Sequence, residues 1–453
     1  MPYTIPAAPA ASRTPSPTHR ELQDRLDALA RTHRVPGAQL ALDTGTDVLS
    51  VHTGTADTAS GTPLTADTAV PLGSLTKPYT AALVMLLADD GDLDLDEPAA
   101  AHLPELSGTP EVTVRQLLSH TGGLPTGWDS DTAATSTAAR YLAAVCTARD
   151  ALFAPGTDFS YSNAGYVAAG RLVETVTGMP WTEAVGALLL EPLGVIPAFT
   201  GDSAPARPVA AGHAVNTATG QALPARQNLA PLEAPAGALL ASARDLAAFG
   251  SALIGRADLL PPAVTKEMRR AGTAARPGAL ADGWGAGVAL YQRDDRVWVG
   301  HDGNAQGTSC HLRADPESGV VVAFTGNSAG ATALWRDLAG ELDRLTGIRV
   351  PAVPAGARSA DRGRPVALPD CLGTYRNGAM TYRVTAGPDG SPALSVDGDL
   401  PIPLVCYADL SCDLLDPDTG RVEPGGRFHR DPASGRVNRV QISGRMACRV
   451  ADG

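Results

Sequence analysis

The 453-residue chain carries 36 basic and 48 acidic residues, for a formal net charge of −12 and a pI near 5.2. Its length predicts two or three domains with ample room for an apolar core. The acidic balance, without any cluster of arginines, excludes the basic surface on which nucleic-acid-binding proteins depend.

The cysteines and the N-terminal segment bear on where the protein works. Residues 1–17 are rich in Pro, Ala, Ser and Thr, so we expect them to be disordered, and they lack the pattern of a secretory signal. No apolar run reaches the roughly eighteen residues that a membrane helix needs. The six cysteines show neither a Cys-x-x-Cys pair nor a metal-ligand spacing. We therefore expect a reduced, cytoplasmic protein with no metal, no organic cofactor, and no nucleic-acid or membrane partner.

The first predicted elements are a helix and a strand. Leu22, Leu26 and Leu29 recur at helical spacing, and residues 35–42 read Val-Pro-Gly-Ala-Gln-Leu-Ala-Leu, which is typical of a strand. A polar, hairpin-like stretch over residues 44–68 then leads to the first motif.

Ser74-Leu-Thr-Lys77 is the stretch with the strongest chemical content. Gly73 and Ser74 suit a turn and a helix start, and the apolar run 81–88 predicts a buried helix. Residues three apart share a helix face, so the Lys77 amine can lie beside the Ser74 hydroxyl. A hydroxyl next to a desolvated amine at a helix N-terminus makes a serine nucleophile, with backbone N–H groups ready for an oxyanion.

Composition strengthens this short motif. Among 36 basic residues only Lys77 and Lys266 are lysines, and one of the two follows Ser74 by three positions. Arginine cannot release its proton in a protein, whereas a buried lysine can. The alternative is a surface lysine on an ordinary helix. Pro78 is best tolerated in a first turn, which places the helix start close to Ser74.

Two further polar stretches have simpler explanations. The acidic run from Asp89 to Asp96 lacks the glycine and glutamate of a calcium loop, so we predict a solvated turn. His120 follows a short helix beginning near Val112 and precedes a Gly-Gly turn. A structural capping role there is favoured over a catalytic one.

Tyr161-Ser-Asn163 follows a Pro-Gly turn and precedes a predicted helix over residues 167–177. Because Tyr161 and Asn163 are two positions apart, both can point the same way in an extended segment. Alone, this motif carries little information.

The pattern changes to an antiparallel meander in the second half of the chain. A closing helix is predicted over residues 331–346. The stretch 350–365 has the composition of a linker, and 366–453 shows the short strands and turns of a small β-barrel. The meander strands are predicted at residues 284–291, 296–303, 308–313 and 319–325.

Three short motifs now stand in order, Ser74-x-x-Lys77, Tyr161-x-Asn163 and His301-x-Gly303. Together they resemble the motifs of the penicillin-recognising serine enzymes, which include class C β-lactamases, D-peptidases and esterases. The stretches beginning at Val112, Glu191 (Glu-Pro-Leu-Gly) and Pro235 also look like family stretches, so the resemblance covers roughly residues 20–346.

The resemblance implies an α/β (α+β) fold of the β-lactamase/transpeptidase kind. An antiparallel sheet flanked by helices would occupy residues 18–349, with a mainly helical subdomain at about 95–280. Leu368-Pro-Asp-Cys-Leu-Gly-Thr-Tyr-Arg resembles the start of appended lipocalin-like barrels, which implies such a barrel over residues 366–453.

The implied chemistry is acyl transfer through Ser74. Tyr161 would take or relay the serine proton and Lys77 would share it, while Asn163 would position Lys77 and bond the substrate amide. The side chains of Tyr161 and Lys77 are poor bases at their ordinary pKa values, so the coupled cluster must shift those pKa values.

The third motif completes the implied site. His301 stands where many relatives have lysine, Gly303 would leave room for the acyl chain, and the backbone N–H of Asn304 would share the oxyanion hole with that of Ser74. Because His-Asp-Gly replaces Lys-Thr-Gly, a fixed cation is lost and an acid gained. This weakens the case for a substrate carboxylate and for a β-lactamase.

With the appended barrel, the chain resembles stand-alone penicillin-binding-protein-type thioesterases, which release and cyclise peptides from nonribosomal synthetases. The implied substrate is a peptidyl or acyl thioester, ester or amide, with a peptide carrier domain as a candidate partner. A cytoplasmic D-peptidase, amidase or esterase is the alternative, and a slowly acylated sensor a further one.

Overall fold

The computed structural model describes residues 17–216, 218–355, 363–387, 390–415, 420 and 422–450. The predicted N-terminal disorder up to residue 16, the middle of the predicted linker (356–362) and parts of two predicted barrel turns (388–389 and 417–419) lie outside these residues. The described chain forms two compact units. The first contains residues up to 95, 169–270 and 285–352, and the second contains 96–168, 271–284 and the residues from 353 onward.

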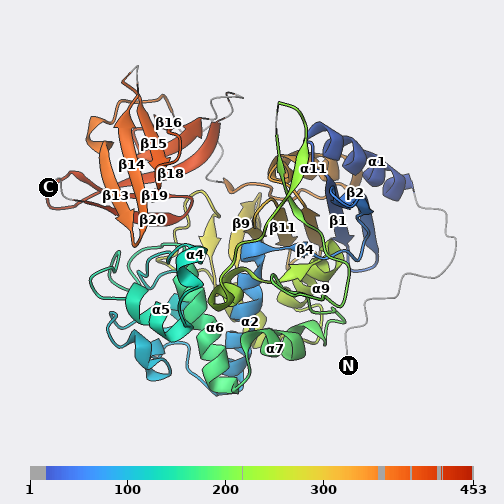
Figure 1. The fold of residues 1–453 in the computed structure, drawn as a ribbon, viewed down its shortest axis with the longest axis horizontal. Helices are drawn as coiled ribbons and strands as arrows, with labels where there is room; N and C mark the ends of the chain where they lie inside the picture. Colours follow the sequence, from blue (N-terminus) through green and yellow to red (C-terminus); the bar gives the residue numbers. More distant parts are fainter. Residues whose placement is uncertain are drawn as a thin grey trace. The chain divides into compact units, whose positions relative to one another are not determined.

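The first unit is built on a large antiparallel sheet in the order β3-β2-β1-β12-β11-β10-β9 (Figure 1). Strands β1 and β12, far apart in the sequence, pair at its centre and are buried along their whole length. Their bounds are β1 Gly37–Asp43, β2 Val48–Asp57, β3 Thr62–Pro63, β9 Ala289–Arg293, β10 Arg296–Gly303, β11 Ser309–Ala314 and β12 Val321–Gly326.

Helices cover both faces of this sheet. On one face His311 of β11 stacks on Trp335 of α11 at 5.0 Å between ring centroids. On the other, α9 approaches so closely that a Cβ on Gly250 would lie 2.6 Å from Val321 Cγ1 and 2.9 Å from Leu312 Cδ1. Burying both faces explains the near-continuous apolar runs of these strands. The covering helices are α1 Pro17–Thr32, α9 Ala243–Leu253 and α11 Ala331–Thr346.

Helix α2 runs from Thr76 to Asp89 after a one-turn 3₁₀ helix, η1, over Gly73–Leu75. Every residue from Thr76 to Met85 is buried, as the apolar run predicted. The remaining elements of this unit are β4 Val70–Pro71, α7 Trp181–Val185, β5 Gly212–Val215, β6 Ala222–Ala225, α8 Ala234–Gly237, β7 Leu240–Ala241 and α10 Pro262–Met268.

The second unit combines short helices with a barrel. Helix α6 (Asn163–Thr177) begins in this unit, four residues before its predicted start, because the Ser162 hydroxyl accepts a hydrogen bond from Gly165 N at 3.0 Å and caps its first turn. The other elements outside the barrel are α3 Val114–Leu118, α4 Ser130–Ala133, α5 Ala138–Val145 and β8 Gly283–Trp284.

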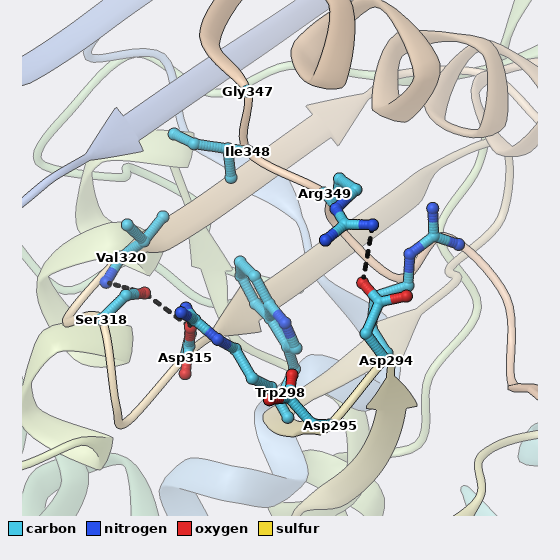
Figure 2. Close-up of a pocket in the computed structure, with 11 residues that line it drawn as sticks. Asp294, Asp295, Trp298, Asp315, Ser318, Val320, Gly347, Ile348 and Arg349 are labelled. Atoms are coloured by element: carbon cyan, nitrogen blue, oxygen red, sulfur yellow. Dashed lines mark hydrogen bonds and ion pairs between the residues drawn. The ribbon is translucent and has the colours of Figure 1, made fainter.

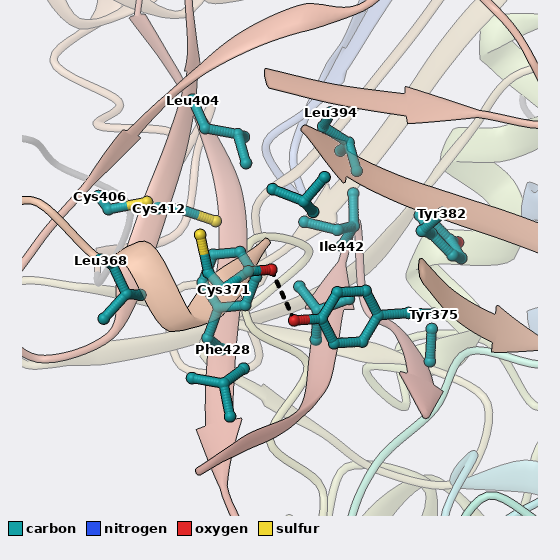
Figure 3. Packing of buried hydrophobic residues seen from close by; sticks show 14 residues of the cluster. Leu368, Cys371, Tyr375, Tyr382, Leu394, Leu404, Cys406, Cys412, Phe428 and Ile442 are labelled. Atoms are coloured by element: carbon teal, nitrogen blue, oxygen red, sulfur yellow. Dashed lines mark hydrogen bonds between the residues drawn. The ribbon is translucent and has the colours of Figure 1, made fainter. Parts of the chain in front are cut away.

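The barrel is closed by eight antiparallel strands, β13 to β20, in sequence order. Inward residues such as Tyr382 and Val384 alternate with exposed ones such as Arg383, as a half-buried strand requires. Figure 3 shows the interior filled by side chains, among them Tyr375 and Phe428. The strands are β13 Gly373–Asn377, β14 Met380–Ala386, β15 Pro392–Val396, β16 Ile402–Cys406, β17 Ser411–Leu415, β18 Val422–Arg430, β19 Val437–Ile442 and β20 Arg445–Arg449.

The predicted fold class, an antiparallel sheet flanked by helices with an appended all-β barrel, is therefore confirmed. None of the helices among the described residues has the length and apolar character needed to span a bilayer.

Candidate active site

Five of the seven predicted site residues, Ser74, Lys77, His301, Gly303 and Asn304, lie in the first unit. Tyr161 and Asn163 lie in the second.

Ser74 and Lys77 lie in hydrogen-bond contact at the start of α2. Lys77 Nζ donates to Ser74 Oγ at 3.1 Å and to the carbonyl oxygen of Ala236 at 2.8 Å. The Lys77 side chain is 1% exposed, whereas Ser74 is half-buried. An amine removed from water and aimed at a reachable hydroxyl is the arrangement that activates a serine.

Helix α8 supplies the second anchor of Lys77, and α2 is fixed to the same segment at two further points. Thr80 Oγ1 donates to the carbonyl of Pro235 at 2.7 Å, and Thr76 Oγ1 accepts from the backbone N–H of Leu239 at 3.0 Å. These bonds fix the rotation of α2 and with it the direction of the Lys77 side chain.

The end of β10 touches the Ser74 turn backbone to backbone, and two glycines permit this. A Cβ on Gly303 would lie 2.0 Å from Leu72 O and 2.7 Å from Leu75 N. A Cβ on Gly73, whose φ is +53°, would lie 2.1 Å from Asn304 O. Real Cβ atoms essentially never approach within 3.0 Å of another atom. Gly303 is therefore required by the packing of the strand against the nucleophile's turn, a reason the sequence did not reveal.

His301 is neutral at physiological pH. Burial, followed by the nearby Lys77, lowers its pKa to about 3. Its Nδ1 lies 2.5 Å from the carbonyl oxygen of Asp302, which can only accept, so Nδ1 carries the proton and Nε2 keeps the lone pair. A neutral imidazole can orient a group by hydrogen bonding, but it cannot replace the fixed cation of a Lys-Thr-Gly motif.

The carboxylate of Asp302 does not add a negative charge beside Ser74, which corrects our expectation. It bonds Arg313 Nη1 at 2.7 Å and His311 Nδ1 at 2.8 Å, both on the neighbouring strand β11. Burial alone would raise the pKa of Asp302, but Arg313 and His311 outweigh burial and hold that pKa well below its usual range. On a strand, residue 302 points to the opposite face from 301 and 303, so its charge is used within the fold.

In the second unit, Tyr161 is 4% exposed and lies against aromatic and cationic side chains. Its ring centroid lies 4.3 Å from that of His120 and 5.8 Å from that of Trp284. The guanidinium carbon of Arg445, from the barrel, lies 5.1 Å from the same centroid. A cation over an aromatic face is attractive and fixes the ring's orientation.

His120 has the structural role that its position predicted. Its φ of 58° places it in the left-handed region, one residue beyond the C-cap Ser119 of α3. Its Nδ1 accepts a hydrogen bond from the backbone N–H of Ser162 at 3.1 Å, and its carbonyl accepts from Ser160 N at 2.9 Å. His120 therefore holds both neighbours of Tyr161.

Asn163 is the first residue of α6, and its backbone N–H donates to the carbonyl of Thr126 at 3.1 Å. The segment 160–163 is thus fixed by hydrogen bonds on both sides of Tyr161.

Two barrel residues that touch this segment, Asn377 and Arg445, could not be identified from the sequence. Asn377 Oδ1 accepts from Thr126 N at 2.6 Å, and Arg445 Nε donates to Thr126 Oγ1 at 3.0 Å. Both lie more than two hundred positions after Tyr161, at the ends of short strands of ordinary composition, so only the folded chain brings them there.

One cavity of the first unit is lined by none of the predicted site residues. Figure 2 shows a pocket of about 260 Å³ at the β9–β10 turn, where Arg349 pairs with Asp294 at 3.2 Å and Asp315 pairs with Arg296 at 2.8 Å. Because these charges neutralise one another, we assign no site there. Within the described ranges, no three His, Cys, Asp or Glu side chains gather in a way that could hold a metal ion.

Comparison with known proteins adds independent information. The family model described as Beta-lactamase matches residues 22–343. Penicillin-binding protein 4 of Amycolatopsis lactamdurans is 34% identical over 377 residues, which cover 79% of this chain and 97% of that protein.

Among solved structures, the crystal structure of SurE is similar with a TM-score of 0.83 and 36% identity, covering 96% of this chain and 99% of that chain. A second structure of SurE contains D-Leu, with a TM-score of 0.80 and 35% identity over the same shares. The D-amino acid amidase from Ochrobactrum anthropi SV3, complexed with L-phenylalanine amide, has a TM-score of 0.62 and 26% identity, covering 73% and 98% of the two chains.

Proposed function

The chain belongs to the β-lactamase family of serine enzymes, and we propose that it releases a peptide from a thioester through a Ser74 acyl-enzyme and closes it into a macrocycle. The observation that carries the acyl-enzyme is the 3.1 Å hydrogen bond between Lys77 Nζ and Ser74 Oγ, with Lys77 buried.

In the proposed first step, Ser74 Oγ bonds to the acyl carbon and the carbon–sulfur bond breaks. The serine proton passes to Tyr161 and Lys77, which share it. It is then transferred to the thiolate, which departs as a thiol. The backbone N–H groups of Ser74 and Asn304 are assigned to the developing oxyanion, for which a preorganised pair of donors is the largest single source of stabilisation.

In the proposed second step, the amine at the peptide's own N-terminus attacks the ester carbon and a carbon–nitrogen bond forms. The ester bond to Ser74 Oγ breaks, and the proton that the amine loses passes through Tyr161 and Lys77 to Ser74 Oγ. Asn163 and the lone-pair nitrogen of His301 are assigned to orienting the peptide amide and the incoming amine. With a pKa near 3, His301 is too weak a base to keep the proton, so proton transfer is assigned to Tyr161 and Lys77.

One observation and one general argument favour an internal amine over water. A carboxypeptidase would need a fixed cation to bind the free terminal carboxylate of its substrate, and the neutral His301 provides none. A peptide folded back on its own ester reaches an effective concentration on the order of 10⁵ M or more, which exceeds that of water in a snug site.

The stereochemistry of the acyl donor is proposed from the relatives. SurE is solved with D-Leu, and another similar structure is a D-amino acid amidase. We therefore assign a D-residue to the acyl position, carried on a small thiol or on a peptide carrier domain.

Hydrolysis is the second candidate, supported by the similarity to the D-amino acid amidase and to Esterase EstB of Burkholderia gladioli. In that case water replaces the amine in the second step and the product is the linear acid.

The deciding experiment offers linear peptidyl thioesters, ending in a D- or an L-residue, and identifies products by mass. The proposal expects a cyclic product, lighter than the linear acid by one water, from the D-ended donor, and none with Ser74→Ala. Linear acid alone from every donor, together with turnover of simple esters or D-amino-acid amides, overturns the cyclase and establishes the hydrolase.

A further inference from the structure

Two turns of the barrel approach the rest of its unit closely. A Cβ on Gly378, after β13, would lie 3.0 Å from Pro125 Cβ. A Cβ on Gly444, between β19 and β20, would lie 2.3 Å from Leu280 Cδ1. These contacts all lie within the second unit.

Asn377, the last residue of β13, has a completely buried side chain whose amide joins three segments. Its Oδ1 accepts from Thr126 N at 2.6 Å, while its Nδ2 donates to Met446 O at 2.7 Å and to Ser160 Oγ at 3.4 Å. Because all three partners are fixed oxygens or N–H groups, only a planar amide of this length serves them together.

The same segment is held by two backbone groups of the barrel. Tyr161 N donates to Gly444 O at 2.9 Å, and Met446 N donates to Ser160 Oγ at 3.2 Å. Ser160 and Tyr161 are thereby attached to the β19–β20 turn and to the start of β20.

From Asn377 the hydrogen bonds continue to the start of α6. Thr126, whose N–H bonds Asn377, accepts with its carbonyl from Asn163 N and from Ala164 N, each at 3.1 Å. One barrel side chain is thus connected to both residues of the Tyr161-x-Asn163 motif.

The interior of the barrel does not explain why the chain carries this domain. It is filled by a cluster of fourteen buried residues, including Tyr375 and Phe428, so the described strands enclose side chains in place of a ligand (Figure 3). Besides the two turns, strand β19 also contacts the rest of the unit, since Gln441 Nε2 donates to Phe159 O at 3.1 Å.

We infer that Asn377 is a positioning residue for Tyr161 and Asn163, and that the barrel is a working part of the catalytic machinery. This inference rests on the proposed function, since it matters for catalysis only if Tyr161 handles the Ser74 proton. An error of about 1 Å in a catalytic group can cost roughly 10²-fold in rate, which sets the expected size of the effect.

The test uses the full-length chain with Asn377→Ala, and Tyr407→Phe as a matched control. Tyr407 OH donates to Asp413 Oδ2 at 2.9 Å, so the control also removes a buried hydrogen bond of the barrel. Two quantities are measured, the single-turnover rate of Ser74 acylation by a p-nitrophenyl ester and the hydrogen exchange of the peptide covering residues 158–166.

Asn377→Ala is expected to lower the maximal acylation rate about 10²-fold, with little change in the ester concentration giving half-maximal rate, and to speed exchange at the Tyr161 amide. Tyr407→Phe is expected to leave both unchanged. A folded Asn377→Ala protein with near wild-type acylation overturns the inference, and so does an equal loss in the control.

Asn377→Asp keeps the test decisive if the alanine variant does not fold. A carboxylate can accept from Thr126 N but cannot donate to Met446 O, whereas the protonated acid can do both. Its acylation rate relative to wild type is therefore expected to rise as the pH falls, and a flat ratio contradicts the inference. Absence of an adduct on wild-type Ser74 would instead refute the proposed function, while the exchange measurement would still report on Asn377.

Discussion

Gly303→Ala tests whether the end of β10 sets the position of the nucleophile. The added methyl would lie 2.0 Å from Leu72 O and 2.7 Å from Leu75 N, one on each side of Ser74 in the chain. Since real Cβ contacts essentially never fall below 3.0 Å, the strand and the turn must separate by at least 3.0 − 2.0 = 1.0 Å. Both obstacles are backbone atoms, so no side-chain rotation can relieve the clash.

A displacement of this size is expected to lower Ser74 acylation about 10²-fold, equivalent to about 2.7 kcal/mol in the activation free energy. Overpacking of this kind also costs about 1–3 kcal/mol of stability, which leaves most of the protein folded at 25 °C if its total stability is ordinary. The effect on acylation should therefore exceed any loss of folded protein.

The assay is the burst of p-nitrophenol from an activated ester under single-turnover conditions, with the folded fraction measured by circular dichroism. Gly340→Ala in α11 is the control, because nothing lies within 4 Å of its added Cβ, and it should acylate normally. Acylation of Gly303→Ala within about threefold of wild type, in folded protein, would refute the close-approach explanation.

Three further predictions address the charged groups. Lys77→Arg keeps the charge, but a guanidinium cannot deprotonate or bridge Ser74 Oγ and Ala236 O as a single ammonium does. Single-turnover acylation should therefore fall at least about 10²-fold. Near-normal turnover would leave Lys77 an electrostatic role only. His301 has a folded pKa of about 3 against about 6.5 unfolded, so its neutral form contributes stability at neutral pH that is lost as the pH falls. In urea titrations, the free energy of unfolding of His301→Gln should therefore fall by about 3 kcal/mol less than that of wild type between pH 6.5 and pH 4. Equal losses in the two proteins would contradict the buried neutral ring. Asp302→Asn leaves the fully buried Arg313 without its carboxylate and should cost about 3–5 kcal/mol in urea unfolding, whereas a loss below about 1 kcal/mol would show that water or another group compensates.

The local elements of this protein were determined by the sequence alone. The helix over 331–346 and the buried helix after Ser74 follow from apolar periodicity, and the turn residues mark the meander and the barrel. The pairing of Ser74 with Lys77 was likewise accessible, because two residues three positions apart share a helix face wherever the helix packs.

Only the tertiary structure decided which groups face the nucleophile. The sequence counted Asp302 as a new charge at the site, but strand alternation and Arg313 on β11 turn its carboxylate to the other face. Gly303 was expected to make room for substrate, yet the backbone of the Ser74 turn occupies the space that its Cβ would fill. The contact of Asn377 with Thr126 spans 251 positions, and no local pattern encodes it, because it depends on where the barrel's turns meet the loop before α6. Periodicity is a property of neighbours along the chain, whereas burial, charge pairing and close approach are properties of neighbours in space.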